Sequence, residues 1–192
     1  YDLKYDKEVK CGALMGILDQ IFVDKELQDY YLEILATGMC GLRIEKVFIG
    51  SGKGGNGKSL LNGLASKTMG NYAYDLPASL MSEKIKLGPN PEAAGLHEKR
   101  LVFFTEPDEK SPLCCSVLKT LTGEDVLGVR NCFSNKVGIA LRLTFIGSCN
   151  NKPDLDEVKK AALDINYFFR SRFVNIKFSS FFSKIKDATD LS

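Results

Sequence analysis

Several features that would place a protein in a functional class are missing from this chain of 192 residues. It contains one histidine and six cysteines, and no two cysteines show the C-x-x-C spacing typical of zinc sites. This composition argues against a zinc protein. No apolar run approaches the length of a membrane span and no signal-peptide pattern opens the chain, so we expect reduced cysteines inside a cell.

The chain also lacks a strong net charge. Its 26 Lys and Arg residues against 24 Asp and Glu give a formal charge of +2, so any basic surface for nucleic acid would have to be local. An apolar content of 44% is ordinary for a soluble globular protein, and the length suits one medium-sized domain with a small appendage. Because the chain begins at Tyr1 rather than Met, we expect it to be a piece of a longer protein.

The first forty residues predict two helices. Asp24 is a candidate N-cap for the second helix, and Gly38 or Gly41 could end it. We expect residues 1–45 to form a helical segment before the main domain, residues 46–192. Apolar residues recur at helical spacing in two runs, Ala13, Leu14, Ile17, Leu18, Ile21 and Phe22, then Leu27, Tyr30, Tyr31, Ile34 and Leu35.

From Lys46 onward, strand patterns alternate with helix patterns. This alternation predicts an α/β fold, in which a central parallel sheet has helices on both faces. The expected strands are Lys46–Gly50, Lys99–Glu106, Ala140–Asn150 and Arg172–Phe178, the expected helices are Lys58–Thr68 and Ser116–Leu121, and Gly88–Gly95 is expected to be a loop.

The stretch Gly52–Ser59 matches the G-x-x-x-x-G-K-S/T pattern of a phosphate-binding loop. An apolar strand leads into it and a helix pattern leaves it, so backbone N–H groups would point at one anion. Lys58 would reach the β and γ phosphates, and Ser59 would offer a hydroxyl to Mg²⁺. The alternative is a flexible turn, which has no need of Lys58 and Ser59. The predicted nucleotide-binding residues are Gly52, Lys53, Gly54, Gly55, Asn56, Gly57, Lys58, Ser59 and Leu60.

Glu106 lies just past four consecutive apolar residues, where the second strand is expected to end. Ligands bind at the carboxyl ends of strands in parallel sheets of this kind. A carboxylate there can hold Mg²⁺ or polarise the attacking water. The alternative is a strand that simply exits into acidic solvent, and pairing with the phosphate loop favours the catalytic interpretation.

Five segments resemble, in order, the motifs of superfamily 3 viral helicases, and specifically the poxvirus-like primase–helicase branch of large DNA viruses. The resemblance covers about Glu45 to Phe178. It implies a modified AAA+ P-loop ATPase that uses ATP and Mg²⁺, assembles as a ring, usually a hexamer, and unwinds DNA at the replication fork. It also implies an upstream primase domain, other replication proteins as partners, and cytoplasmic replication factories in the host. The five segments are "GSGKGGNGKSLL", "RLVFFTEPDE", "LKTLTGEDVLGVR", "GSCNNKP" and "FRSRFVNIKF".

The resemblance also assigns roles to individual residues at the nucleotide. Lys58 and Ser59 match the Walker A contacts, and Glu106 matches the Walker B acid. Asn150 matches the sensor 1 asparagine that orients the attacking water, a role that suits an amide because it bonds both water and phosphate without acting as a base. Without the resemblance, Asn150 would be interpreted as a turn residue. Thr105 stands where many ATPases have Asp, which leaves open whether Glu106 binds metal, activates water or does both.

Two arginines near the end of the resemblance are candidates for contact with a neighbouring subunit. Arg172 matches the arginine finger that reaches a neighbour's γ-phosphate, and Arg170 is the alternative. A guanidinium is always charged and forks onto phosphate oxygens, which suits this role. Ser171 separates the two arginines, however, and by themselves they could be a surface pair on an edge strand.

The family places a DNA-contacting hairpin before sensor 1. In this chain the segment Asn131–Gly138 has turn residues beside Lys136, with Phe133 nearby and Arg130 just before it. A lysine at a hairpin tip can pair with phosphate, and an aromatic ring can stack on a base. The resemblance therefore implies that Lys136, Arg130 and Phe133 bind DNA, while an ordinary solvated hairpin is the alternative.

Two other functions remain open from the sequence. A small-molecule P-loop kinase would need an acceptor site and a mobile lid with several arginines, and the sequence shows no such cluster. An assembly module that binds ATP without turnover is supported mainly by Thr105.

Overall fold

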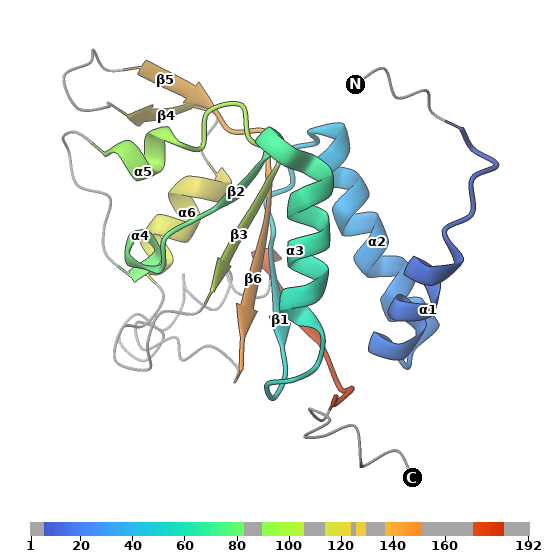
Figure 1. The fold of residues 1–192 in the computed structure, drawn as a ribbon. Helices are drawn as coiled ribbons and strands as arrows, with labels where there is room; N and C mark the ends of the chain where they lie inside the picture. The colour runs from blue at the N-terminus through green and yellow to red at the C-terminus, as the bar shows by residue number, and fades with distance from the viewer. Residues whose placement is uncertain are drawn as a thin grey trace, which may run out of the picture.

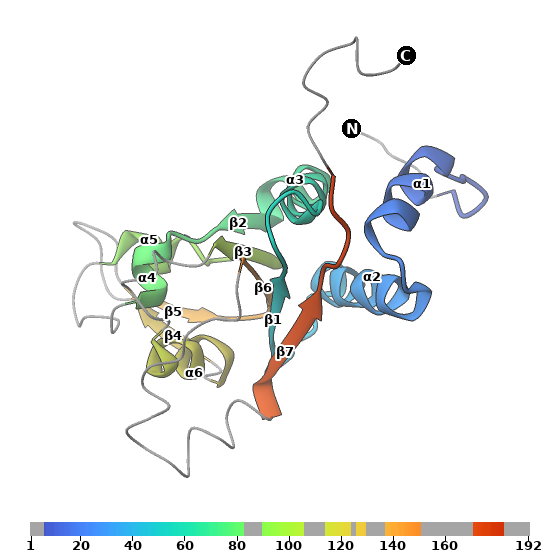
Figure 2. The same ribbon diagram turned by 90° about the horizontal axis from the view of Figure 1, so that it is seen from below.

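The computed structural model describes residues 6–82, 90–105, 114–123, 126–129, 137–150 and 171–182. Its centre is a five-stranded sheet of order β2-β3-β6-β1-β7, in which all neighbouring strands are parallel (Figure 1). Helices cover both faces of this sheet (Figure 2). The predicted α/β fold with a central parallel sheet is thus confirmed. The strands are β1 (Val47–Ser51), β2 (Ala73–Asp75), β3 (Leu101–Thr105), β6 (Thr144–Cys149) and β7 (Phe173–Lys177).

Two helices, α1 (Gly12–Ile21) and α2 (Lys25–Cys40), precede the sheet, as the sequence predicts. Asp24 is the N-cap of α2, and its carboxylate accepts the backbone N–H of Glu26 at 2.9 Å. Gly41 ends α2 in the left-handed conformation with φ 61°, which places the helix end at the second of the two candidate glycines. None of the helices in the described part of the chain is long and apolar enough to cross a membrane.

We expect Asp24→Ala to lower the free energy of unfolding by about 1 kcal/mol, because the N–H of Glu26 would lose its acceptor. Asp24→Asn keeps a side-chain oxygen at the cap and should leave stability nearly unchanged. Urea denaturation followed by circular dichroism would measure both variants. Equal losses in the two would show that the charge at the helix N-terminus matters and the hydrogen bond does not.

An apolar core lies on each face of the sheet. Side chains alternate along β1, so Phe48 faces a core with α1, α2 and α3, while Ile49 faces a core with α4, α5 and α6. Because both faces are covered, the central strands are continuous apolar runs rather than alternating ones. The remaining helices are α3 (Lys58–Met69), the 3-10 turn η1 (Gly70–Tyr72), α4 (Ala78–Ser82), α5 (Pro91–Ala94) and α6 (Cys115–Gly123).

Strands β4 (Val126–Val129) and β5 (Val137–Ala140) pair antiparallel in a separate two-stranded sheet. The prediction of one strand over Ala140–Asn150 is wrong, because β5 ends at Ala140 and β6 begins at Thr144. Between them the chain leaves the small sheet and enters the large one. Leu141 and Leu143 are buried and the intervening Arg142 is exposed, so the alternation of a strand continues across the break.

The sequence patterns also failed to predict several short helices and strands. The stretch Gly88–Gly95 was expected to be a loop, but it contains the one-turn helix α5. Asn90 caps this helix by accepting the N–H of Ala93 at 2.9 Å, and Pro91 occupies the first turn. Neither β2 nor α4 was predicted, since elements of three to five residues are too short to show a periodicity.

Candidate functional site

The loop between β1 and α3 leaves the sheet at the carboxyl ends of its strands. The register places Ser51, the last residue of β1, beside Cys149 of β6 and Lys177 of β7. The two residues that follow these strand ends, Gly52 and Asn150, therefore start from the same edge of the sheet. This edge is where open parallel sheets bind their ligands. The expected order of strand, loop and helix around the glycine-rich stretch is present.

Gly57 closes the loop and precedes α3 with a left-handed φ of 86°. The left-handed conformation favours glycine, and a Cβ at this position would also lie 2.6 Å from Cδ1 of Ile21 in α1, so that side chain would have to shift. Within the described residues, no side chain caps the N-terminus of α3. The N–H groups of its first turn are thus open to an anion, and the helix dipole favours negative charge there.

Lys58, the first residue of α3, is folded back into the loop and is only 6% exposed. Its Nζ donates to the carbonyl oxygen of Gly52 at 2.7 Å and to Oδ1 of Asn56 at 2.9 Å. Burial lowers the pKa of the Lys58 ammonium below its ordinary value, and nearby Cys149 opposes this shift. Both partners of the ammonium are neutral, so a phosphate oxygen would offer it a stronger, charge-assisted hydrogen bond.

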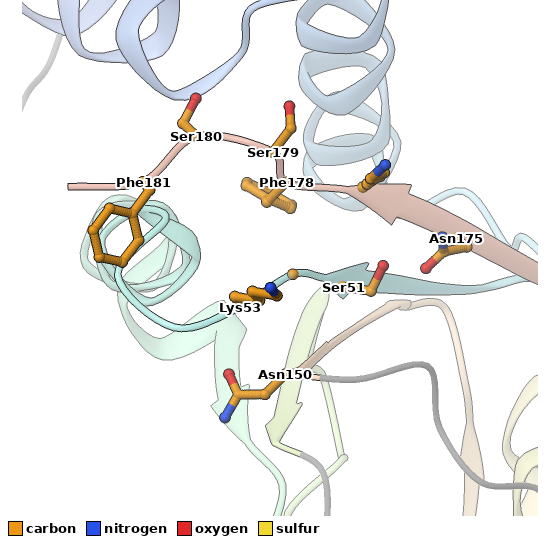
Figure 3. Close-up of a pocket in the computed structure, with 10 residues that line it drawn as sticks. Ser51, Lys53, Asn150, Asn175, Phe178, Ser179, Ser180 and Phe181 are labelled. Atoms are coloured by element: carbon orange, nitrogen blue, oxygen red, sulfur yellow. The ribbon is translucent and has the colours of Figure 1, made fainter.

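A cavity of about 750 Å³ opens beside the loop (Figure 3). Gly52 and Lys53 line it from the loop, Asn150 from the end of β6, and residues up to Phe181 from the chain after β7. Cavities of this size bind nucleotide-sized ligands. Ser59 and Leu60 are exposed on the first turn of α3. The fold thus brings together the loop residues and Asn150.

Several predicted site residues lie outside the described residues. These are Glu106, Arg170, Arg130, Phe133 and Lys136. The strands that flank them in the sequence are described: β3 ends at Thr105, beside Ser148 near the carboxyl end of β6. For the DNA-binding candidates, Val129 of β4 pairs with Val137 of β5, so an antiparallel pair of strands flanks residues 130–136 in the sequence.

Arg172 lies at the opposite edge of the sheet from the phosphate loop. It directly precedes β7, whose first residue, Phe173, pairs with Val47 at the start of β1. Its guanidinium forms an ion pair with Oε2 of Glu45 at 2.8 Å and donates to Oγ1 of Thr122 at 3.2 Å. The five residues of β1 separate the two edges by about 16 Å. With these partners, Arg172 does not contact the phosphate loop of its own chain.

The sequence patterns missed one part of the site. Residues Phe178–Phe182, after β7, run alongside the loop, and Phe182 donates its N–H to the carbonyl oxygen of Gly55 at 2.7 Å. The segment belongs to no helix or strand, so no periodicity marks it. The only sequence feature that could have indicated this part of the site is the pair Phe181 and Phe182, shortly after the predicted strand Arg172–Phe178.

No protein-family model matches the chain. The chain is 32% identical over 194 residues to the primase D5 of fowlpox virus. The aligned region covers 91% of this chain and 24% of that protein. It is 28% identical over 143 residues to the putative helicase L207/L206 of Acanthamoeba polyphaga mimivirus. This aligned region covers 73% of this chain and 15% of that protein. The chain thus spans about a quarter or less of the length of these relatives.

The fold also has a counterpart among solved structures. The C-terminal region of NrS-1 matches with a TM-score of 0.68 and 21% sequence identity. The match covers 92% of this chain and 40% of that one. At this identity the match shows a shared fold over most of this chain.

Proposed function

We propose that this chain is the ATPase domain of a superfamily 3 DNA helicase. The chain is a distant homologue of the poxvirus primase D5 and of the mimivirus putative helicase. In this proposal the protein forms a ring, hydrolyses ATP between subunits, and moves on DNA to unwind it during viral DNA replication. One observation carries the proposal: the buried Lys58 bonds back to a glycine-rich loop at the carboxyl edge of the sheet, and Gly52 and Lys53 of that loop line a nucleotide-sized cavity together with Asn150.

The loop residues would bind the phosphates. Open N–H groups at the start of α3 would donate to phosphate oxygens, and Lys58 would exchange its contacts with Gly52 and Asn56 for the β and γ phosphates. Ser59 and Glu106 would hold Mg²⁺. The bound Mg²⁺ would neutralise the charge that develops on the phosphates. Asn150 would orient the attacking water, and Glu106 would polarise it.

The position of Arg172 supports the proposed ring. Phosphoryl transfer is accelerated when an arginine stabilises charge on the transferred group. Arg172 lies at the far edge of the sheet from its own loop and is held there by Glu45. A contact with the γ-phosphate is therefore proposed to come from a neighbouring copy, with Arg170 as the second candidate.

The DNA contacts are proposed for the connection between β4 and β5, with Lys136 and Arg130 on the phosphates and Phe133 on a base or sugar. Several copies around a ring would concentrate positive charge that the whole chain lacks. In this proposal the domain works with an upstream primase domain and other replication proteins, in the cytoplasm of the host cell.

We expect single-stranded DNA to raise the ATPase rate of the full-length, ring-forming protein several-fold, because strand movement and hydrolysis would be coupled. Phosphate release with and without DNA, at saturating ATP and Mg²⁺, measures this. Transfer of phosphate to a nucleoside with no effect of DNA would instead identify a small-molecule kinase. Tight binding without turnover would identify an assembly module, and either result contradicts the helicase.

A further inference from the structure

The chain that follows β7 is attached to the phosphate loop at two points. Phe178 donates its N–H to the carbonyl oxygen of Ser51 at 2.8 Å, where the loop begins. Phe182 donates its N–H to the carbonyl oxygen of Gly55 at 2.7 Å, in the middle of the loop. The five residues Phe178–Phe182, here called the wall segment, thus span the first half of the loop.

The wall segment is also anchored to the N-terminal helices. Ser180 donates its hydroxyl to the carbonyl oxygen of Ile21 at 2.7 Å, at the end of α1. The ring of Phe178 is buried and packs against Phe22 and Tyr31, with ring centroids 5.0 and 6.1 Å away. Contacts to the loop, to α1 and to α2 therefore fix the path of the segment.

The approach of the wall segment to the loop is close enough to require a glycine. A Cβ at Gly52 would lie 2.3 Å from the carbonyl oxygen of Phe178, which is backbone and cannot rotate away. The same carbonyl accepts the amide of Asn56 at 3.5 Å, while the other atom of that amide group accepts from Lys58 at 2.9 Å. One buried side chain thus connects the wall segment to the ammonium of the loop.

Phe181 has the most exposed aromatic side chain of the wall segment, at 73% against 42% for Phe182, although its backbone is held between the anchored residues Ser180 and Phe182. Its ring lies over the loop, with Cε2 3.5 Å from where a Cβ of Gly55 would be (Figure 3). It lines the same cavity as Gly52 and Lys53. A single exposed aromatic residue is ordinary on a protein surface, but this one is fixed beside a predicted phosphate site and presents a free apolar face.

We propose that the wall segment forms the nucleoside-binding side of the triphosphate site, and that the ring of Phe181 stacks on the base. The inference rests on the proposed function, in which the loop binds the phosphates. A triphosphate bound there must place its ribose and base in the adjoining space, and the cavity of about 750 Å³ has room for them. Because every base has a π face, Phe181 would favour nucleotides over bare triphosphate without selecting one base.

Calorimetric titration of the full-length protein with MgATP and with Mg-tripolyphosphate would test this assignment. The wild type should bind ATP more tightly than tripolyphosphate. Phe181→Ala should weaken ATP binding roughly tenfold and leave tripolyphosphate binding unchanged, whereas Phe181→Tyr should bind ATP like the wild type. Tyr72→Ala is the control, because this exposed aromatic side chain lies on η1, outside the wall segment and the cavity lining, and it should change neither affinity.

The outcomes distinguish this inference from the function on which it rests. If the wild type binds ATP and tripolyphosphate equally, or if Phe181→Ala binds ATP as tightly as the wild type, the stacking role is wrong and the phosphate site stands. If Tyr72→Ala loses as much ATP affinity as Phe181→Ala, the assignment to Phe181 is wrong. If the wild type binds neither ligand, the proposed function itself fails, and the inference fails with it.

Discussion

Lys58→Ala should reduce ATP hydrolysis by the full-length protein by about 10²- to 10³-fold, the loss seen when one preorganised electrostatic contact to the transition state is removed. The structure places this ammonium inside the loop, where burial strengthens its interaction with phosphate. Phosphate release under saturating ATP and Mg²⁺ would measure the loss.

Lys67→Ala is the matched control for this prediction. Lys67 lies on the last turn of the same helix, is exposed to solvent, and carries the same charge. Its removal should leave the rate nearly unchanged. Because Lys58→Ala also leaves the buried Oδ1 of Asn56 without its donor, circular dichroism must show that the variant is folded. If a folded Lys58→Ala protein kept near wild-type turnover, the loop would have no catalytic role.

Arg172→Ala should lower the turnover of the assembled protein by about 10³- to 10⁵-fold, which is the contribution of an arginine finger to phosphoryl transfer. The substitution also removes the ion pair with Glu45, so a loss of activity alone could reflect altered packing. Glu45→Gln separates the two effects, since it breaks the same ion pair and keeps the guanidinium. That variant should hydrolyse ATP at least as fast as the wild type.

Mixing the two variants within the proposed ring tests whether Arg172 acts on a neighbour. Rings of Lys58→Ala alone or Arg172→Ala alone should both be inactive. In mixed rings, some interfaces combine an intact Lys58 from one subunit with an intact Arg172 from the next, so part of the activity should return. If mixing restores nothing, or if Arg172→Ala rings keep full turnover, the assignment of Arg172 as the finger is wrong.

Sequence patterns were sufficient for the parts of the fold that depend on local chemistry. The candidate phosphate loop could be predicted because glycines at given spacings permit close approach to an anion, and the strand and helix expected to flank it are present. Asp24 was identified as an N-cap for a similar reason, since its oxygen bonds an N–H only two residues away. The parallel sheet followed from apolar runs separated by helices. The short elements β2, α4 and α5 are too brief to leave a periodic pattern, and contacts from neighbouring elements determine them.

The arrangement around the loop depended on the tertiary structure, because its contacts join residues that are distant in the chain. The register between β1 and β6 brings Asn150 to the edge where Gly52 begins the loop. The parallel pairing of β7 with β1 places Arg172 at the opposite edge. Nothing local in the sequence of Phe178–Phe182 specifies that its N–H groups bond to Ser51 and Gly55. The residues proposed to bind phosphate could therefore be predicted from the sequence, whereas the residues proposed to surround the rest of the nucleotide become visible only when the sheet is assembled.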